Sequence, residues 1–172
     1  MYLFALCLML LSWRADAESD IPRAYRVIAF QEKVPADIVY AVATVESRYF
    51  IKTINRNRPW PWTLNIEKKP YFFKTRAEAI QKLNNYLRTG GESVAIGVMQ
   101  IYWRWHKDKF KSPGHALEPY YNIRIGARYL RRKYMLTNDW YTAVGHYHDA
   151  GTSPEALQRA EHYRKLVYRE LR

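Results

Sequence analysis

Residues 34–49 read VPADIVYAVATVESRY, and the interpretation of the whole chain starts from this stretch. Pro35 suits the first position of a helix, where its missing N–H would have no partner, and Asp37 adds a negative charge to the first turn. On a helical wheel the apolar side chains share one arc, formed by Ile38, Val39, Val42, Val45 and Tyr49. The pattern predicts an amphipathic helix from Pro35 to about Tyr49.

Glu46 lies within the edge of that apolar arc, so its carboxyl group is expected to point towards the core. Burial disfavours the charged form and raises a carboxyl pKa, which lets the group hold a proton near neutral pH as a general acid must. The alternative is that Glu46 pairs with an arginine such as Arg48 or caps a buried loop. Helix geometry alone does not decide between the two.

The rest of the sequence predicts a mainly α fold with at most a small β-hairpin. Residues 54–73 (INRNRPWPWTLNIEKKPYFF) form a loop whose prolines exclude a regular helix and whose last part suits a hairpin. Thr75 and Glu78 form a capping box that opens a helix ending at Gly90 and Gly91. Further helices are expected near 98–104, 118–136 and 139–147, and from Pro154 onward with Ser153 as its cap.

The first 17 residues, MYLFALCLMLLSWRADA, combine an apolar run with a small-x-small site at Ala15–Ala17 and predict a signal peptide. The run is short for a bilayer span, so a permanent membrane anchor is the weaker alternative. Cys7, the only cysteine, lies in this segment, so cleavage would exclude disulfides and thiolate metal sites. Residues 18–172 have the length of one domain with a proper core.

The chain carries 28 Lys and Arg against 16 Asp and Glu, a formal net charge of +12. Such a charge attracts polyanions, including nucleic acid, anionic lipid and an acidic cell wall. Export favours the wall, and no nucleic-acid-binding module is recognised. The five histidines show no metal-ligand spacing, so neither a metal nor another cofactor is predicted.

Three motifs occur in an order that resembles the lytic transglycosylases of the soluble (Slt) type, which are related in fold to goose-type lysozyme. Glu46-Ser47 is similar to the catalytic Glu-Ser pair of that family. Residues 97–101 (GVMQI) resemble its Gly-Leu-Met-Gln-Ile segment. Residues 122–130 (NIRIGARYL) resemble its Asn-Ile…Gly…Tyr-Leu helix. The resemblance covers about residues 30–165.

Two features depart from the family pattern. Residues 143–151 read AVGHYHDAG where the family has a turn ending in Ala-Tyr-Asn-Ala-Gly. Tyr147 matches the tyrosine, His148 replaces the asparagine, and Asp149 is an extra residue. The connection from Ser47 to Gly97 is longer than usual, and an inserted segment is expected at about 54–91. Its RPWPWTLN core is similar to transglycosylases found with conjugation and integrating-element transfer systems.

The resemblance implies an exported, periplasmic and monomeric enzyme that cleaves the MurNAc-GlcNAc β-1,4 bond of peptidoglycan glycan strands for local remodelling of the cell wall. Glu46 would be its single acid and base, and 1,6-anhydro-MurNAc ends would be its product. The implied partners are the glycan strands and a type IV secretion or conjugation apparatus, with no nucleic acid and no stable membrane anchor. Two other functions stay open: a hydrolase of the lysozyme kind, and a non-catalytic wall-binding or assembly protein.

Each of the other candidate site residues also has an alternative, purely structural role. Tyr147 is expected to donate a hydrogen bond to Glu46 and set its charge state, unless it only packs in the core. Ser47 either bonds the substrate or caps a turn, and Met99 either lines the cleft or packs. Candidates for substrate binding, with aromatic rings as sugar platforms, are Ser47, Met99, Gln100, His148, Trp60, Trp62 and Tyr102. Trp103 and Trp105 are further platform candidates.

Overall fold

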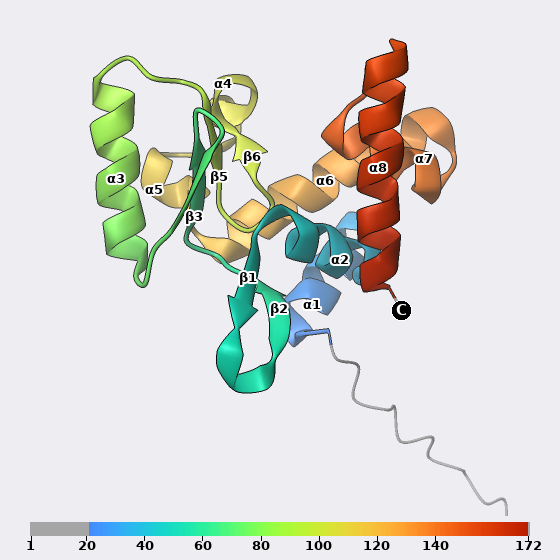
Figure 1. The fold of residues 1–172 in the computed structure, drawn as a ribbon, viewed down its shortest axis with the longest axis horizontal. Coiled ribbons are helices and arrows are strands. Elements are labelled where there is room, and N and C mark those ends of the chain that lie inside the picture. Colours follow the sequence, from blue (N-terminus) through green and yellow to red (C-terminus); the bar gives the residue numbers. More distant parts are fainter. Residues whose placement is uncertain (1–20, 172) are drawn as a thin grey trace, which may run out of the picture.

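The computed structural model describes residues 21–171, so the predicted signal peptide (1–17) lies outside the described part. Five helices pack into one region: α1 (Arg23–Glu32), α2 (Ala36–Glu46), α6 (Pro119–Thr137), α7 (Trp140–His148) and α8 (Pro154–Glu170). A second region holds α3 (Arg76–Arg88) and a small sheet, which lie on the opposite side of the molecule from α7 and α8 (Figure 1). Within residues 21–171 no helix is long and apolar enough to cross a membrane.

Helix α2 lies at the centre of the helical region and contacts α1, α6 and α8. Its side chains Val39, Val42 and Ala43 are fully buried, as the apolar arc predicts. The helix ends at Glu46, so the prediction that it runs to about Tyr49 is wrong. The chain instead enters strand β1 (Arg48–Ile51), because pairing with β2 (Arg56–Pro59) satisfies the backbone groups that another helical turn would have used.

The β structure comprises two antiparallel sheets in the described residues. Strands β1 and β2 form a hairpin around a short 3₁₀ turn, η1 (Lys52–Ile54). The other sheet has the order β4-β3-β5-β6, with β3 (Thr63–Ile66), β4 (Lys69–Phe72), β5 (Val94–Ile96) and β6 (Ile101–Tyr102). The mainly α fold class is confirmed, with a larger β part than the single hairpin expected. The segment expected as an insertion therefore forms most of the second region.

The predicted helix caps are confirmed where the sequence signal is local. Thr75 and Glu78 form a reciprocal capping box at the start of α3, and Ser153 accepts a hydrogen bond from the Ala156 amide at the start of α8. The helices expected near 118–136 and 139–147 correspond to α6 and α7. Helix α1 was not predicted as a helix; Pro22 at its N-cap provides no side-chain capping bond.

The helix expected at 98–104 is wrong. Residues 97–100 form a turn in which Gly97 and Gln100 have φ values of 76° and 46°, both in the left-handed region. Residues 101–102 then pair with β5, and only a single turn, α4 (Trp103–His106), is helical. A 3₁₀ turn, η2 (Lys107–Lys109), and the short helix α5 (Pro113–Ala116) lead into α6.

Asn122 on α6 stabilises the turn formed by residues 97–100. Its Nδ2 donates to the carbonyls of Ile96 and Ala116, each at 2.9 Å, and its Oδ1 accepts from the Met99 amide at 2.8 Å. The side chain is buried, so these hydrogen bonds replace the water it has lost. Gly97 packs so closely on Asn122 that a Cβ at position 97 would lie 2.5 Å from its Nδ2.

We predict that Asn122→Ala lowers the free energy of unfolding by about 2 to 4 kcal/mol, because it leaves buried backbone groups without partners. Chemical denaturation measures the change. The matched control is Asn84→Ala on the exposed face of α3, which we expect to stay within about 0.5 kcal/mol of the parent protein. Equal effects of the two substitutions would contradict a structural role for the Asn122 bonds.

Candidate active site

Glu46 is the last residue of α2 and is half-buried. Burial raises its pKa to about 7, although a hydrogen bond from the Tyr163 hydroxyl to Oε1, 2.6 Å long, acts in the opposite direction. Arg48 pairs with Glu170 at 2.8 Å, so the alternative pairing of Arg48 with Glu46 is wrong. The carboxyl group is therefore poised to exchange a proton near neutral pH.

Tyr163, the partner of Glu46, comes from α8 and was not predicted as a site residue. It is 4% exposed, and burial together with the Glu46 charge raises its pKa well above the usual value, so it remains a protonated donor. His148 stacks on it with ring centroids 4.6 Å apart. Helical spacing could have revealed Tyr163, because the buried face of α8 comprises Ala156, Ala160, Tyr163 and Val167.

Tyr147 lies near Glu46. Burial and the charge of Glu46 raise the pKa of Tyr147, but the Tyr147 hydroxyl donates its hydrogen bond to another residue. It bonds the Met99 carbonyl at 2.7 Å, so the expected hydrogen bond from Tyr147 to Glu46 is replaced by the one from Tyr163. The physical reason is that the 97–100 turn presents a carbonyl to the end of α7. Tyr147 thus connects the turn to the helical region.

A pocket of about 320 Å³ opens beside the Glu46 carboxyl group. Six of the predicted site and platform residues line it: Glu46, Gln100, Tyr102, Trp105, Tyr147 and His148. Its other lining residues are Ile101, His106 and Tyr129. Trp105, a platform candidate, is 70% exposed. His106 and Tyr129 were not predicted as lining residues.

Five predicted substrate-binding or platform residues do not line this pocket: Ser47, Met99, Trp60, Trp62 and Trp103. Met99 is fully buried against Gly126 and acts through its backbone carbonyl. The Ser47 hydroxyl donates to the Ala43 carbonyl and accepts from the Trp60 amide, which is the local capping role that was its alternative. Trp60 donates its indole N–H to the Phe73 carbonyl and contacts Trp62 edge to face. These residues support the site without lining it.

Gln100 reaches the pocket because of its unusual backbone conformation. Its positive φ turns the side chain back, so that Nε2 donates to the Gly97 carbonyl at 2.8 Å. A non-glycine residue in the left-handed region costs free energy and persists only where its surroundings fix it. Asn122 and Tyr147 supply that support by bonding the backbone of Met99 on either side.

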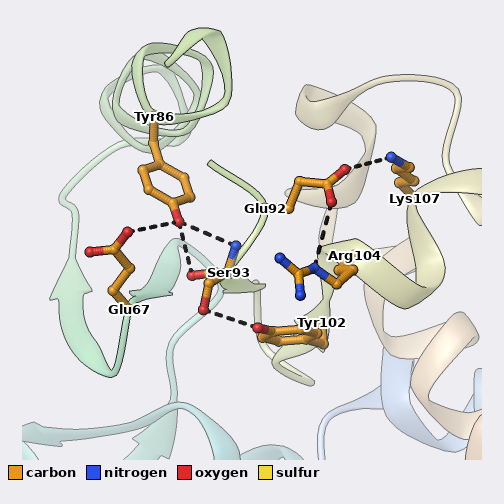
Figure 2. A network of polar contacts seen from close by, with 7 residues as sticks. All are labelled: Glu67, Tyr86, Glu92, Ser93, Tyr102, Arg104 and Lys107. Carbon is orange, nitrogen blue, oxygen red and sulfur yellow. Dashed lines mark hydrogen bonds and ion pairs between the residues drawn. The ribbon is translucent and has the colours of Figure 1, made fainter. Parts of the chain in front are cut away.

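Tyr102 is fixed in the pocket wall by a polar network (Figure 2). Its hydroxyl donates to Ser93 Oγ at 3.0 Å, and the Ser93 amide donates to the Tyr86 hydroxyl at 3.2 Å. Tyr86 projects from α3, so the network joins α3 to the pocket wall. Next to it, Glu92 pairs with Arg104 and Lys107 and ties the same connection to α4 and η2.

The model of the transglycosylase SLT domain family matches residues 24–168. The chain belongs to this family. Its members are lytic transglycosylases that act on peptidoglycan, and the lysozyme-like fold predicted from the motifs is confirmed. No curated protein and no solved structure matches the chain.

The SLT-domain pocket offers one carboxylate to a substrate, because Glu46 is the only Asp or Glu among its described lining residues. His106 and His148 have pKa values lowered by burial, so both favour the neutral form. Among residues 21–171, no group of three or more His, Cys, Asp or Glu side chains is placed to hold a metal ion.

We predict that Tyr163→Phe moves the alkaline limb of the pH–activity profile to higher pH. The Tyr163 hydrogen bond favours the charged form of Glu46 and lowers its pKa, so its removal raises the pKa further. The profile of kcat/KM between pH 5 and 9 measures the shift. Tyr141→Phe is the control, because Tyr141 also donates to a carboxylate, Glu161, but outside the pocket. A downward shift for Tyr163→Phe would contradict the assignment.

We also predict that Glu46→Gln makes the folded protein more stable at alkaline pH. With a folded pKa near 7 and an ordinary value of 4.5, the folded state binds more protons between these limits, so stability falls as pH rises through this window. The substitution removes a penalty of about 3 kcal/mol above pH 7. Melting temperatures at pH 4.5 and 8 test this: the gain should appear only at pH 8.

The control for stability is Glu155→Gln on the exposed first turn of α8. The pKa of Glu155 is lowered, so its charged form favours folding and the substitution should bring no gain at pH 8. A similar rise in melting temperature for both variants would show that the gain does not come from the burial of Glu46.

Proposed function

We propose that this SLT-domain protein is a lytic transglycosylase that cleaves the MurNAc-GlcNAc β-1,4 bond and leaves 1,6-anhydro-MurNAc ends. The observation that carries the proposal is the single carboxylate in the pocket, Glu46, with a pKa near 7. Glycosidases that use water or a covalent intermediate usually place two carboxylates around the scissile bond. A site with one carboxylate suits a substrate whose own groups replace the second carboxylate.

In the first step, the protonated Glu46 donates its proton to the glycosidic oxygen while the bond from that oxygen to C1 of MurNAc breaks. The carbonyl oxygen of the substrate's N-acetyl group stabilises the positive charge that develops at C1. In the second step, the C6 hydroxyl oxygen attacks C1, and the Glu46 carboxylate takes its proton. Glu46 ends protonated, as it began, and no water is consumed.

The surroundings of Glu46 support both halves of this cycle. Burial favours the protonated form that starts the reaction, and the Tyr163 hydroxyl stabilises the carboxylate that forms during it. Because the attacking hydroxyl belongs to the reacting sugar, proximity supplies much of the rate enhancement once the ring is held. Gln100 and Tyr102 line the same pocket and are placed to hold the sugar.

The proposal includes export to the periplasm by residues 1–17, since the substrate lies outside the cytoplasm, and a role in local wall remodelling. A link to a secretion or conjugation apparatus rests on residues 58–65 (RPWPWTLN). In the structure this stretch extends from the end of β2 into β3, beside the end of α2, where the Trp60 amide bonds Ser47. A partner contacting it would therefore lie near the catalytic helix.

We predict that Glu46→Gln lowers the rate of wall cleavage by roughly 10²- to 10⁴-fold, because it removes the proton donor at nearly constant volume. Release of soluble fragments from purified sacculi measures the rate, and mass spectrometry identifies the ends. Products of the parent protein should carry anhydro ends, one water lighter than hydrolysed ends. Glu155→Gln is the control and should retain full activity.

The other functions have distinct outcomes. Hydrolysed ends from the parent protein would indicate a hydrolase of the lysozyme kind and contradict the intramolecular step. Binding to sacculi without any cleavage would indicate a wall-binding or assembly protein. Full activity of Glu46→Gln would refute the assignment of the acid.

A further inference from the structure

A second pocket, of about 240 Å³, lies next to the catalytic pocket and shares His106 and Tyr129 with it. We call it the basic side pocket; its lining residues are His106, Lys109, Ile125, Arg128, Tyr129 and Arg132. The two shared rings meet edge to face, with centroids 5.3 Å apart, and Tyr129 also contacts Tyr147. A ligand in the catalytic pocket therefore has the basic side pocket as its immediate neighbour.

The basic side pocket lies between α6 and the segment formed by α4 and η2. Its four α6 residues have the spacing i, i+3, i+4, i+7, which places them on one face of the helix: Ile125, Arg128, Tyr129 and Arg132. His106 and Lys109 come from α4 and η2. The lining of the basic side pocket thus combines an aliphatic side chain and an aromatic side chain with several cationic side chains.

The charge of the basic side pocket is positive even after its ion pairs are considered. No carboxylate lines it, although Asp108 bonds Lys109, and Glu32 is shared between Arg124 and Arg128. Arg132 forms no ion pair among the described residues, and its charge, like that of Lys109, lowers the pKa of His106. Arg124 and Arg128 share the single carboxylate of Glu32, and Arg132 has no carboxylate partner among the described residues. The pocket therefore keeps an unbalanced positive charge that suits an anionic ligand.

We propose that the basic side pocket binds a free carboxylate of the peptide stem that peptidoglycan carries on its muramic acid. The inference rests on the proposed function, because it requires a glycan strand in the catalytic pocket. The sugars of that strand are uncharged, whereas each stem begins at a lactyl group on the sugar and bears carboxylates along its length. A guanidinium group matches a carboxylate with two parallel hydrogen bonds, and Ile125 and Tyr129 can contact the stem's methyl and methylene groups.

The test compares two substrates: soluble glycan strands that carry their peptide stems, and stripped strands, from which an amidase has removed the stems and in which the lactyl carboxylates that this hydrolysis frees have been converted to neutral methyl amides. For Arg132→Gln we expect KM on the stem-bearing strands to rise roughly three- to tenfold, as loss of one solvent-exposed ion pair would produce, with kcat unchanged. KM on the stripped strands should not change. Arg132→Lys keeps the charge without the planar fork and should give an intermediate KM.

The matched control is Arg169→Gln, which removes one exposed arginine at the end of α8, outside the basic side pocket. Its KM should equal that of the parent protein on both substrates. All assays are run at physiological ionic strength, where contacts between distant exposed charges are largely screened. An equal rise in KM on stripped strands, or the same rise with Arg169→Gln, would overturn the inference, and so would no change with Arg132→Gln.

Binding separates this inference from the proposed function. If the parent protein cleaves neither substrate, the proposed function fails, and the dissociation constants of Glu46→Gln for the two strand preparations still test the pocket. Weaker binding to stem-bearing strands alone, when Arg132→Gln is added, supports the inference. Binding that does not depend on Arg132 overturns it whether or not the protein is an enzyme.

Discussion

The hydrogen bond between Tyr163 and Glu46 is the contact on which the site depends, and it joins residues 117 positions apart. A carboxyl group buried without a partner would keep its proton too firmly to act later as a base, and an exposed one would not hold a proton at neutral pH. Burial and the tyrosine hydroxyl together place its pKa near 7. This balance requires α8 to dock on α2, so α8 is part of the candidate active site.

The pocket around Glu46 is assembled from several elements that fix one another. The Ser47 hydroxyl ties the end of α2 to the Trp60 amide. Asn122 on α6 and Tyr147 on α7 bond the backbone of Met99 on either side. These contacts hold Gln100 in a left-handed conformation that an isolated turn would not maintain. Ser47, Met99 and Asn122 therefore support the pocket without lining it, whereas Tyr147 does both.

The sequence predicted the features that depend on local chemistry. Helix periodicity placed Glu46 on the inner side of α2, and capping residues located the starts of α3 and α8. The errors fall where distant contacts decide the structure. Residues 98–104 have helix-compatible apolar spacing, but Asn122 and the pairing of β5 with β6 impose a turn and a strand. Which tyrosine bonds Glu46 depends on how α7 and α8 pack, so periodicity alone could place Tyr163 inside but not name its partner.

The distribution of charge is consistent with a raised carboxyl pKa in a strongly basic protein. No Lys or Arg is found among the described residues that line the catalytic pocket, and its two histidines favour the neutral form. A cation 4 Å from Glu46 would stabilise its carboxylate by roughly 4 kcal/mol at an effective dielectric constant of 20. That would lower its pKa by about three units, because one unit corresponds to about 1.4 kcal/mol, and the proton would be lost at neutral pH. A strongly basic chain and a raised carboxyl pKa thus place opposite demands on the site. In the described residues Lys109, Arg128 and Arg132 line the neighbouring pocket, which shares only His106 and Tyr129 with the pocket around Glu46.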